Sequence, residues 1–291
     1  MQFGGSADET ASQAMYEAAR AAGVTHFDTA YAYNGGASEQ ILGRMIAKER
    51  DSLIIATKVG YIGGGRRQNL LEQFDECRKR LGLDYVDILY LHHHDPEVEL
   101  SETIDAFATL KSRGQIGHIG LSNLAAWQVM KAQSFASNFD LRVGILQPMY
   151  SLVKRQVEVE ILPMCVDQGI EVAPYSPLGG GLLTGKYAGG GTGRLTEDSR
   201  YTARYDFDWM HATAAQLVSL ADELGTNPAT LAVAWAMAHD SRPRPIVSAR
   251  SAAQLGPSLD ALGFQMTPEI YRRVAALSRT PPPATDRAEE A

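Results

Sequence analysis

Four side chains with acid–base chemistry lie in the first third of the chain, three of them directly after apolar runs. Asp28, Lys58 and His92 each end such a run, and Tyr33 lies five residues beyond Asp28. A phenol is a weak acid at neutral pH, but an ammonium group beside it favours the phenolate and lowers its pKa. Together these four residues predict a proton-transfer site if the strand ends converge.

The runs before these residues predict parallel strands that are buried on both faces, because they are apolar without alternation. We expect strands at 24–27, 53–57, 86–91, 116–121, 143–147, 170–173 and 245–247. Helix-period stretches lie at 10–22, 38–48, 69–81, 100–112, 157–168, 208–224, 228–238, 252–261 and 268–278. This alternation predicts an α/β fold of the (β/α)8 TIM-barrel type, and the lack of an early G-x-G-x-x-G motif argues against a doubly wound sheet. Barrel enzymes carry their reactive groups at the carboxyl ends of strands, so the strand-end residues should converge.

Seven predicted strands are one fewer than a closed barrel of this kind needs. The chain passes from residues 1–5 almost directly into a helix, so we expect strand 1 to be missing or incomplete, with 1–5 supplying its last residues. We expect 1–280 to form a single barrel domain and 281–291, which is Pro-rich and then charged, to be a mobile tail. The Gly-rich stretch 174–209 has no clear periodicity and predicts a long loop on the active-site face.

Composition restricts the partners. The net charge of −7 argues against nucleic acid or an anionic membrane as the main partner. Cys77 and Cys165 lie far apart and predict free thiols, not a disulfide framework. Without an apolar run of about 20 residues or a signal-peptide pattern, we expect a cytoplasmic protein. The sequence indicates no oligomeric state.

The residues around the four side chains resemble the aldo-keto reductase family. The segment 27–33 (FDTAYAY) is similar to the family signature around its catalytic Asp and Tyr. The segments 56–58 (ATK) and 84–92 (DYVDILYLH) are similar to its lysine and histidine strands. Further segments agree in order, so the resemblance extends from about residue 1 to residue 278. The run 179–187 (GGGLLTGKY) is most similar to the branch that includes the potassium-channel β-subunits and their bacterial relatives.

The resemblance implies a nicotinamide-dependent reductase of aldehydes, ketones or sugar-like carbonyls, in which hydride attacks the carbonyl carbon and Tyr33 protonates the oxygen. In that site Lys58 would lower the pKa of Tyr33, Asp28 would keep Lys58 charged, and neutral His92 would direct the carbonyl oxygen by hydrogen bonding. The resemblance also implies cofactor contacts from Ser122, Asn123, Gln147, Tyr175, Ser176, Leu178, Lys186, Arg200, Ser248, Arg250 and Gln254. The first three would hold the carboxamide, Tyr175 would stack on the nicotinamide, and 176–186 would cover the pyrophosphate. Arg250 suits a 2′-phosphate because its guanidinium is planar and permanently charged, which favours NADP(H) and leaves NAD(H) open. Tyr61 is the best candidate for the substrate pocket.

Some positions depart from the family pattern, and other functions remain as alternatives. Pro257 and Ser258 replace the usual Glu and Asn near adenine, and Ser248 replaces a Gly. His93 and His94 follow His92, but consecutive strand residues point to different faces, so we predict no metal site. One alternative is a cofactor-holding, redox-sensing subunit with little turnover. Another is an unrelated barrel lyase or isomerase, which would bind no nicotinamide.

Overall fold

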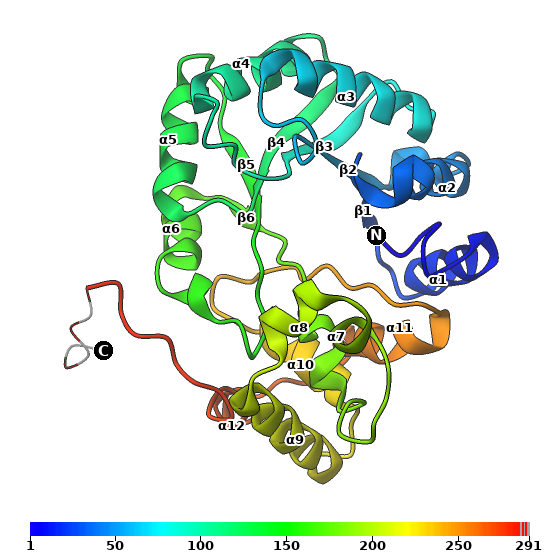
Figure 1. The fold of residues 1–291 in the computed structure, drawn as a ribbon, viewed down its shortest axis with the longest axis vertical. Coiled ribbons are helices and arrows are strands. Elements are labelled where there is room, and N and C mark those ends of the chain that lie inside the picture. Colours follow the sequence, from blue (N-terminus) through cyan, green and yellow to red (C-terminus); the bar gives the residue numbers. More distant parts are fainter. Residues whose placement is uncertain (286, 288, 290–291) are drawn as a thin grey trace. The chain divides into compact units, whose positions relative to one another are not determined.

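The computed structural model describes residues 1–285, 287 and 289 (Figure 1). Its internal contacts divide the chain into two compact units. The first unit comprises Met1–Gln147, Gly169–Glu171 and Ser248–Leu255. The second comprises Pro148–Gln168, Val172–Val247 and Gly256–Ala291.

A parallel sheet forms the centre of the first unit. Its strands are β1 (His26–Asp28), β2 (Ile54–Val59), β3 (Val86–Leu91), β4 (Ile116–Ser122), β5 (Val143–Gln147) and β6 (Glu171–Val172), whose second residue belongs to the second unit. They are hydrogen-bonded in chain order, and the pairs from β1 to β5 are parallel. Figure 1 shows these strands side by side in a curved sheet. The fold is therefore α/β, with a six-stranded parallel sheet curled as part of a barrel.

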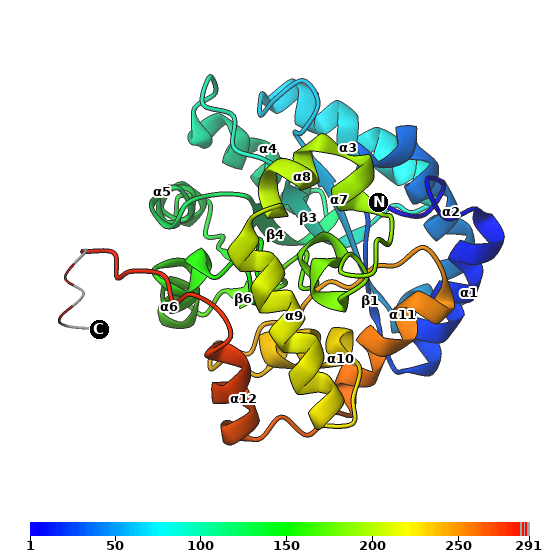
Figure 2. The same cartoon turned by 60° about the horizontal axis from the view of Figure 1, so that its bottom comes forward.

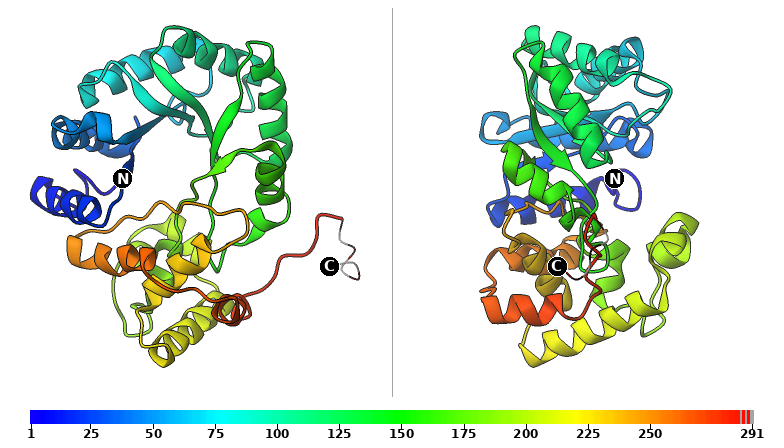
Figure 3. Two further views of the ribbon diagram at one scale, coloured as in Figure 1. Left: turned by 180° about the vertical axis from the view of Figure 1, so that it is seen from behind. Right: turned by 90° about the vertical axis from the view of Figure 1, so that its left-hand side faces the viewer.

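Helices cover the convex side of this sheet, as Figure 3 also shows. They are α1 (Glu9–Ala21), α2 (Ala37–Ile46), α3 (Arg67–Leu81), α4 (Leu100–Ser112) and α5 (Ala126–Ser137). The short 3₁₀ helices η1 (Tyr33–Gly36) and η2 (Arg50–Ser52) lie in this part of the chain, and α11 (Ala252–Leu259) begins in it. Local signals set the helix ends. Asp8 caps α1 by accepting a hydrogen bond from the Ala11 amide, and Gly82 ends α3 in the left-handed conformation.

The second unit is mostly helical (Figure 2). It contains η3 (Gln156–Glu158), α6 (Ile161–Gln168), η4 (Gly179–Thr184), α7 (Arg194–Glu197), α8 (Ser199–Tyr205), α9 (Asp208–Glu223), α10 (Pro228–Met237), η5 (Asp260–Leu262) and α12 (Pro268–Ala275). The helix α10 is apolar on nearly all sides, and its fully buried Trp235 packs against the rings of Tyr150 and Tyr271. A helix that is apolar all round belongs in a core. Within the described chain, no helix has the length and apolar character needed to cross a membrane.

Three expectations about local structure differ from what is observed. The predicted strand at 245–247 is a single parallel bridge between Ile246 and Tyr175, although the amides of Arg244 and Ile246 donate to the carbonyls of Val172 and Pro174. The stretch 174–209, which was predicted to be a loop, contains η4, α7 and α8. These elements are too short to show periodicity, yet Tyr201 and Tyr205 are buried on α8.

The N-terminal residues also differ from the expectation. Instead of a strand end, they form a tight turn in which the amides of Gly5 and Ala7 both donate to the Gln2 carbonyl. In the described chain the first strand is β1. At the C-terminal end we predicted a mobile tail at 281–291. Residues 286, 288, 290 and 291 of this segment lie outside the described residues, so its mobility stays a prediction.

Candidate active site

A buried ion pair lies at the carboxyl ends of β1 and β2. The Nζ atom of Lys58 pairs with Oδ1 of Asp28, and the exposed fractions of the two side chains are 0% and 7%. The same Nζ donates to the Thr29 carbonyl at 2.7 Å and to the Tyr33 hydroxyl at 3.4 Å. Burial by itself lowers the pKa of Lys58, but the charges and hydrogen bonds of Asp28 and Tyr33 outweigh it, so the pKa is raised. Lys58 is therefore a buried cation.

Tyr33 and His92 complete this group. Tyr33 begins η1, and its ring meets the imidazole edge-on with 5.7 Å between the ring centroids. Burial lowers the pKa of His92 to about 3, and the positive charge of Lys58 contributes to the lowering. The imidazole is thus neutral at physiological pH. Its buried Nδ1 has no hydrogen-bond partner within the described chain. The structure places the four predicted residues together, as the strand-end argument required.

Three polar residues from the ends of β4 and β5 join the same network. Ser122 Oγ donates to the Gln147 carbonyl at 2.9 Å. The Asn123 amide donates to the His92 carbonyl at 3.0 Å and to Ser122 Oγ at 3.1 Å. Asn123 has a φ of +62°, a left-handed conformation that Asn tolerates better than most residues. Gln147 Nε2 donates to Asp28 Oδ2 at 3.0 Å. These contacts link the three residues predicted to hold the nicotinamide carboxamide directly to Asp28 and His92.

The chemical character of this network fits a nicotinamide carboxamide. A carboxamide both donates and accepts hydrogen bonds, and Ser122, Asn123 and Gln147 provide hydroxyl and amide groups of both kinds in one cluster. The unpartnered Nδ1 of His92 lies in the same cluster. Tyr61 lies beside it, with its ring centroid 5.0 Å from that of His92, and this residue is 57% exposed.

The other predicted cofactor residues lie elsewhere in the chain. Ser248, Arg250 and Gln254 belong to the first unit, near the start of α11, where the Arg250 amide donates to Gln254 Oε1 at 3.2 Å. The remaining five belong to the second unit: Tyr175, Ser176, Leu178, Lys186 and Arg200.

In that second unit, η4 contains Gly180 and Gly181, with φ of +68° and +95°. A Cβ at Gly181 would lie 3.2 Å from the Lys186 side chain, so the two positions are neighbours. Arg200 is held by Asp198 through a 2.8 Å ion pair and is 73% exposed.

Tyr90 is a site neighbour that the sequence analysis missed. Its side chain is fully buried, it pairs in register with Lys58, and its ring lies 5.9 Å from Lys58 Nζ. A Cβ at Gly120 would come within 2.4 Å of this ring, so only glycine leaves room for it. The available signal was spacing, because Tyr90, on β3, lies two residues before His92, which directly follows that strand, and alternate positions of an extended chain share a face.

Comparison with known proteins identifies the class to which this chain belongs. The sequence matches the model of the Aldo/keto reductase family over residues 1–279. The chain therefore belongs to the aldo/keto reductase family and is an oxidoreductase. This agrees with the resemblance carried by the strand-end residues.

Several curated relatives resemble the chain over most of its length. A probable voltage-gated potassium channel subunit beta from Oryza sativa is 31% identical, over 98% of this chain and 92% of its own length. An uncharacterized oxidoreductase, YrpG, from Bacillus subtilis is 31% identical, over 94% of this chain and 88% of its own. The L-glyceraldehyde 3-phosphate reductase of Escherichia coli is 32% identical, over 82% and 75% respectively.

Proposed function

We propose that this protein reduces an aldehyde, ketone or sugar-like carbonyl to an alcohol with NADP(H), with Tyr33 as the proton donor. The observation that carries this proposal is the 3.4 Å contact between the Tyr33 hydroxyl and the fully buried ammonium of Lys58. A cation at that distance stabilises the phenolate that remains when the proton leaves. If Lys58 and Asp28 lay together without the phenol of Tyr33, a structural ion pair would be a sufficient explanation of their contact.

Each residue then has a distinct task. A bound reduced nicotinamide supplies the hydride to the carbonyl carbon. Negative charge grows on the carbonyl oxygen, and Tyr33 delivers a proton there. Asp28 keeps Lys58 charged and oriented, and neutral His92 positions the oxygen by hydrogen bonding. Groups oriented in advance toward a developing oxyanion are usually a large part of catalysis.

The cofactor assignment follows the same logic. Ser122, Asn123 and Gln147 would hold the carboxamide, and Tyr175 would stack on the ring. The segment 176–186, including Leu178 and Lys186, would cover the pyrophosphate with help from Arg200. Ser248, Arg250 and Gln254 would bind the adenosine-phosphate end. The permanent charge of Arg250 supports NADP(H) over NAD(H), since a 2′-phosphate needs a cationic partner.

Three broader inferences accompany this function. We infer that residues 1–280 form one domain of the (β/α)8 barrel type, supported by the family match to residue 279 and by the helix that follows each strand from β1 to β5. Tyr61, close to His92, would form one wall of the substrate pocket. A cytoplasmic location is supported by two buried free thiols, Cys77 and Cys165, which suit a reducing compartment.

A second candidate function is a nicotinamide-holding, redox-sensing subunit with little turnover. The similarity to the plant protein named as a probable potassium channel subunit beta favours it. The two functions differ in turnover, not in cofactor binding.

Fluorescence titration with NADPH and NADH tests cofactor binding. Steady-state assays with aliphatic aldehydes, aromatic aldehydes, ketones and glyceraldehyde 3-phosphate test turnover. We expect tighter binding of NADPH and oxidation of NADPH with some members of the panel. Binding without turnover of any carbonyl would favour the redox-sensing subunit, and a lack of binding to either dinucleotide would exclude both functions.

A further inference from the structure

A second ionic cluster lies on the opposite side of β2 from Lys58. Thr57 precedes Lys58 and so points to the other face of the strand. Its Oγ1 donates to Glu39 Oε1 at 2.6 Å, and Glu39, on α2, is fully buried. The other carboxylate oxygen of Glu39 accepts from Nη1 of Arg80 on α3 at 3.4 Å. A buried carboxylate is costly unless a cation pairs with it, so Glu39 and Arg80 depend on each other.

Arg80 also contacts the loop that carries Tyr33. Its Nη1 donates to the Tyr31 carbonyl at 3.2 Å, and its guanidinium lies 4.6 Å from the centroid of the Tyr31 ring. At the other end of the loop, a Cβ on Gly36 would lie 2.7 Å from the Arg80 guanidinium carbon. The guanidinium therefore touches both ends of the segment 31–36, and Tyr33 lies between these contacts.

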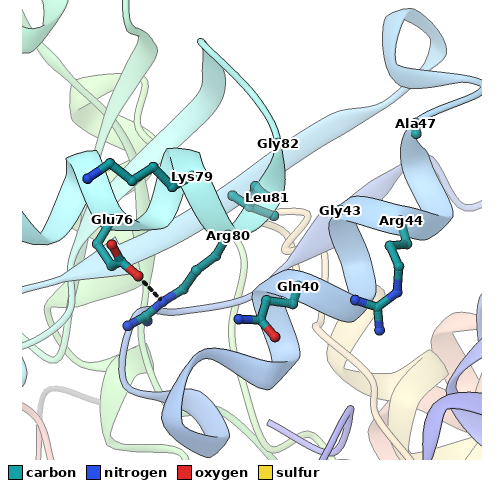
Figure 4. A pocket seen from close by; sticks show the side chains of 9 residues that line it. All are labelled: Gln40, Gly43, Arg44, Ala47, Glu76, Lys79, Arg80, Leu81 and Gly82. Carbon is teal, nitrogen blue, oxygen red and sulfur yellow. Dashed lines mark hydrogen bonds and ion pairs between the residues drawn. The ribbon is translucent and has the colours of Figure 1, made fainter.

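A second carboxylate fixes the outer side of the same guanidinium. Arg80 Nε donates to Glu76 Oε1 at 3.0 Å, and both side chains face the shallow groove between α2 and α3 (Figure 4). With Glu39 on one side and Glu76 on the other, the planar group has a defined orientation. These contacts hold Arg80 toward the Tyr33 loop instead of leaving it for a ligand in the groove.

Contacts with other parts of the chain hold this loop, among them hydrogen bonds from Asn34 Nδ2 to the carbonyls of Met1 and Phe3. Asn34 and Gly35 inside η1 have φ of +52° and +61°, so regular helical geometry does not propagate through it. The Tyr31 amide donates to the Lys58 carbonyl at 3.0 Å, which ties the start of the loop to β2. Beyond that bond, the contacts of Arg80 with Tyr31 and Gly36 join the loop to α3.

We propose that Arg80 is a positioning residue: it holds the segment 31–36 so that the Tyr33 hydroxyl stays beside the Lys58 ammonium. This inference rests on the proposed function, in which Tyr33 donates the proton. It assigns to Glu39 and Gly36 the supporting tasks of orienting the guanidinium and leaving space for it. Loss of Arg80 would therefore slow proton delivery without removing any group that touches substrate or cofactor.

The test compares Arg80→Met with Lys79→Met, which removes the same charge from an exposed position one residue earlier on α3. Hydrogen–deuterium exchange measures the amides of 29–36, independently of activity. We expect Arg80→Met to speed exchange there and to lower kcat about ten-fold or more, with the Kd for NADPH changed by no more than about two-fold. Lys79→Met should change none of these quantities. Faster exchange spread equally over α2 and α3 would indicate a merely structural role and overturn the proposal.

Two further variants keep the test open if Arg80→Met does not fold. Arg80→Met/Glu39→Gln removes the unpaired buried charge and should still loosen 29–36. Arg80→Lys restores the charge but not the planar group, so we expect recovered stability with kcat below that of the wild type. Unchanged exchange in 29–36 in every folded variant would overturn the proposal. If the wild type turns over no carbonyl, the proposed reaction fails, and with it the catalytic task of Arg80, while the exchange data still decide whether Arg80 holds the loop.

Discussion

Gln147 and Asp28, 119 residues apart in sequence, share a 3.0 Å hydrogen bond from Nε2 of the amide to Oδ2 of the carboxylate. The other oxygen of Asp28 is paired with Lys58. The carboxylate is thus held on both oxygens, from the end of β5 and from β2. Gln147, which we predicted as a cofactor contact, therefore also orients Asp28, the carboxylate that keeps Lys58 charged.

Gln147→Leu separates these two tasks. A hydrogen bond to a charged group contributes about 1.5–3 kcal/mol, so the free energy of unfolding without cofactor should fall by roughly that amount. Urea denaturation of the cofactor-free protein measures it. Gln13→Leu, at an exposed position on α1, should change stability by less than about 0.5 kcal/mol. A loss confined to NADPH binding, with stability unchanged, would mean that the contact with Asp28 is energetically unimportant.

Tyr33→Phe removes only the proposed proton donor. Since general acid catalysis contributes about 10²–10⁴-fold, kcat should fall by at least about 10², with NADPH affinity nearly unchanged. Steady-state kinetics and fluorescence titration provide both quantities. Tyr31→Phe is the matched control, because the contacts of Tyr31 with Arg80 use its ring and backbone carbonyl, and its activity should remain high. Retained turnover in Tyr33→Phe would disprove the assignment.

His92 makes stability depend on pH. Burial lowers its pKa from 6.5 to about 3, so between these values the unfolded chain binds a proton that the folded protein does not. This contribution to stability is complete above about pH 6.5 and is lost as the pH falls toward 3. From pH 7 to pH 5 it amounts to at most about 2 kcal/mol. Urea denaturation at both values should show a smaller loss for His92→Gln than for the wild type, and parallel losses would contradict the shifted pKa.

The two arginines assigned to the cofactor should differ in their effect. Arg250→Gln should weaken NADPH about 10–100-fold and leave NADH nearly unchanged, because only NADPH has a 2′-phosphate for the charge to bind. Arg200→Gln should have a smaller effect, since Asp198 already pairs with Arg200 at 2.8 Å. Fluorescence titration of each variant with NADPH and with NADH measures these affinities. Equal losses for NADPH and NADH in Arg250→Gln would place the side chain away from the 2′-phosphate.

Gly120→Ala tests the space beside the site. The new Cβ would lie 2.4 Å from the Tyr90 ring, and overpacking of this kind costs about 1–3 kcal/mol. The double variant Gly120→Ala/Tyr90→Leu should recover part of the loss by removing the ring. Gly256→Ala, on α11 with nothing near its added Cβ, should be neutral or stabilising. Thermal unfolding of the purified variants measures all three, and an undisturbed Gly120→Ala would show that the sheet adjusts at that point.

Strong local patterns allowed much of the fold to be predicted. The helix expected at 100–112 is observed as α4 (Leu100–Ser112), and the strand expected at 86–91 is β3 (Val86–Leu91). The helix has a long periodic pattern and the strand is a continuous apolar run, and a short-range pattern of either kind is sufficient for the prediction. Asp28, Lys58 and His92 could be found because parallel strands bring their carboxyl ends to one edge, so strand-end position predicts proximity. Tyr33 was added because it lies in the loop that directly follows Asp28 and because of the family resemblance.

The sequence by itself determined which residue types stand at the strand ends and where the long elements lie. Only the tertiary structure decided how those side chains pair. The bond between Gln147 and Asp28 joins distant parts of the chain, and the contact of Arg80 with the Tyr33 loop depends on how α3 packs against α2. Neither leaves a local signal, because each depends on distances across the sheet and between helices. The burial that keeps His92 neutral and the charge of Lys58 paired likewise exists only after the chain has folded.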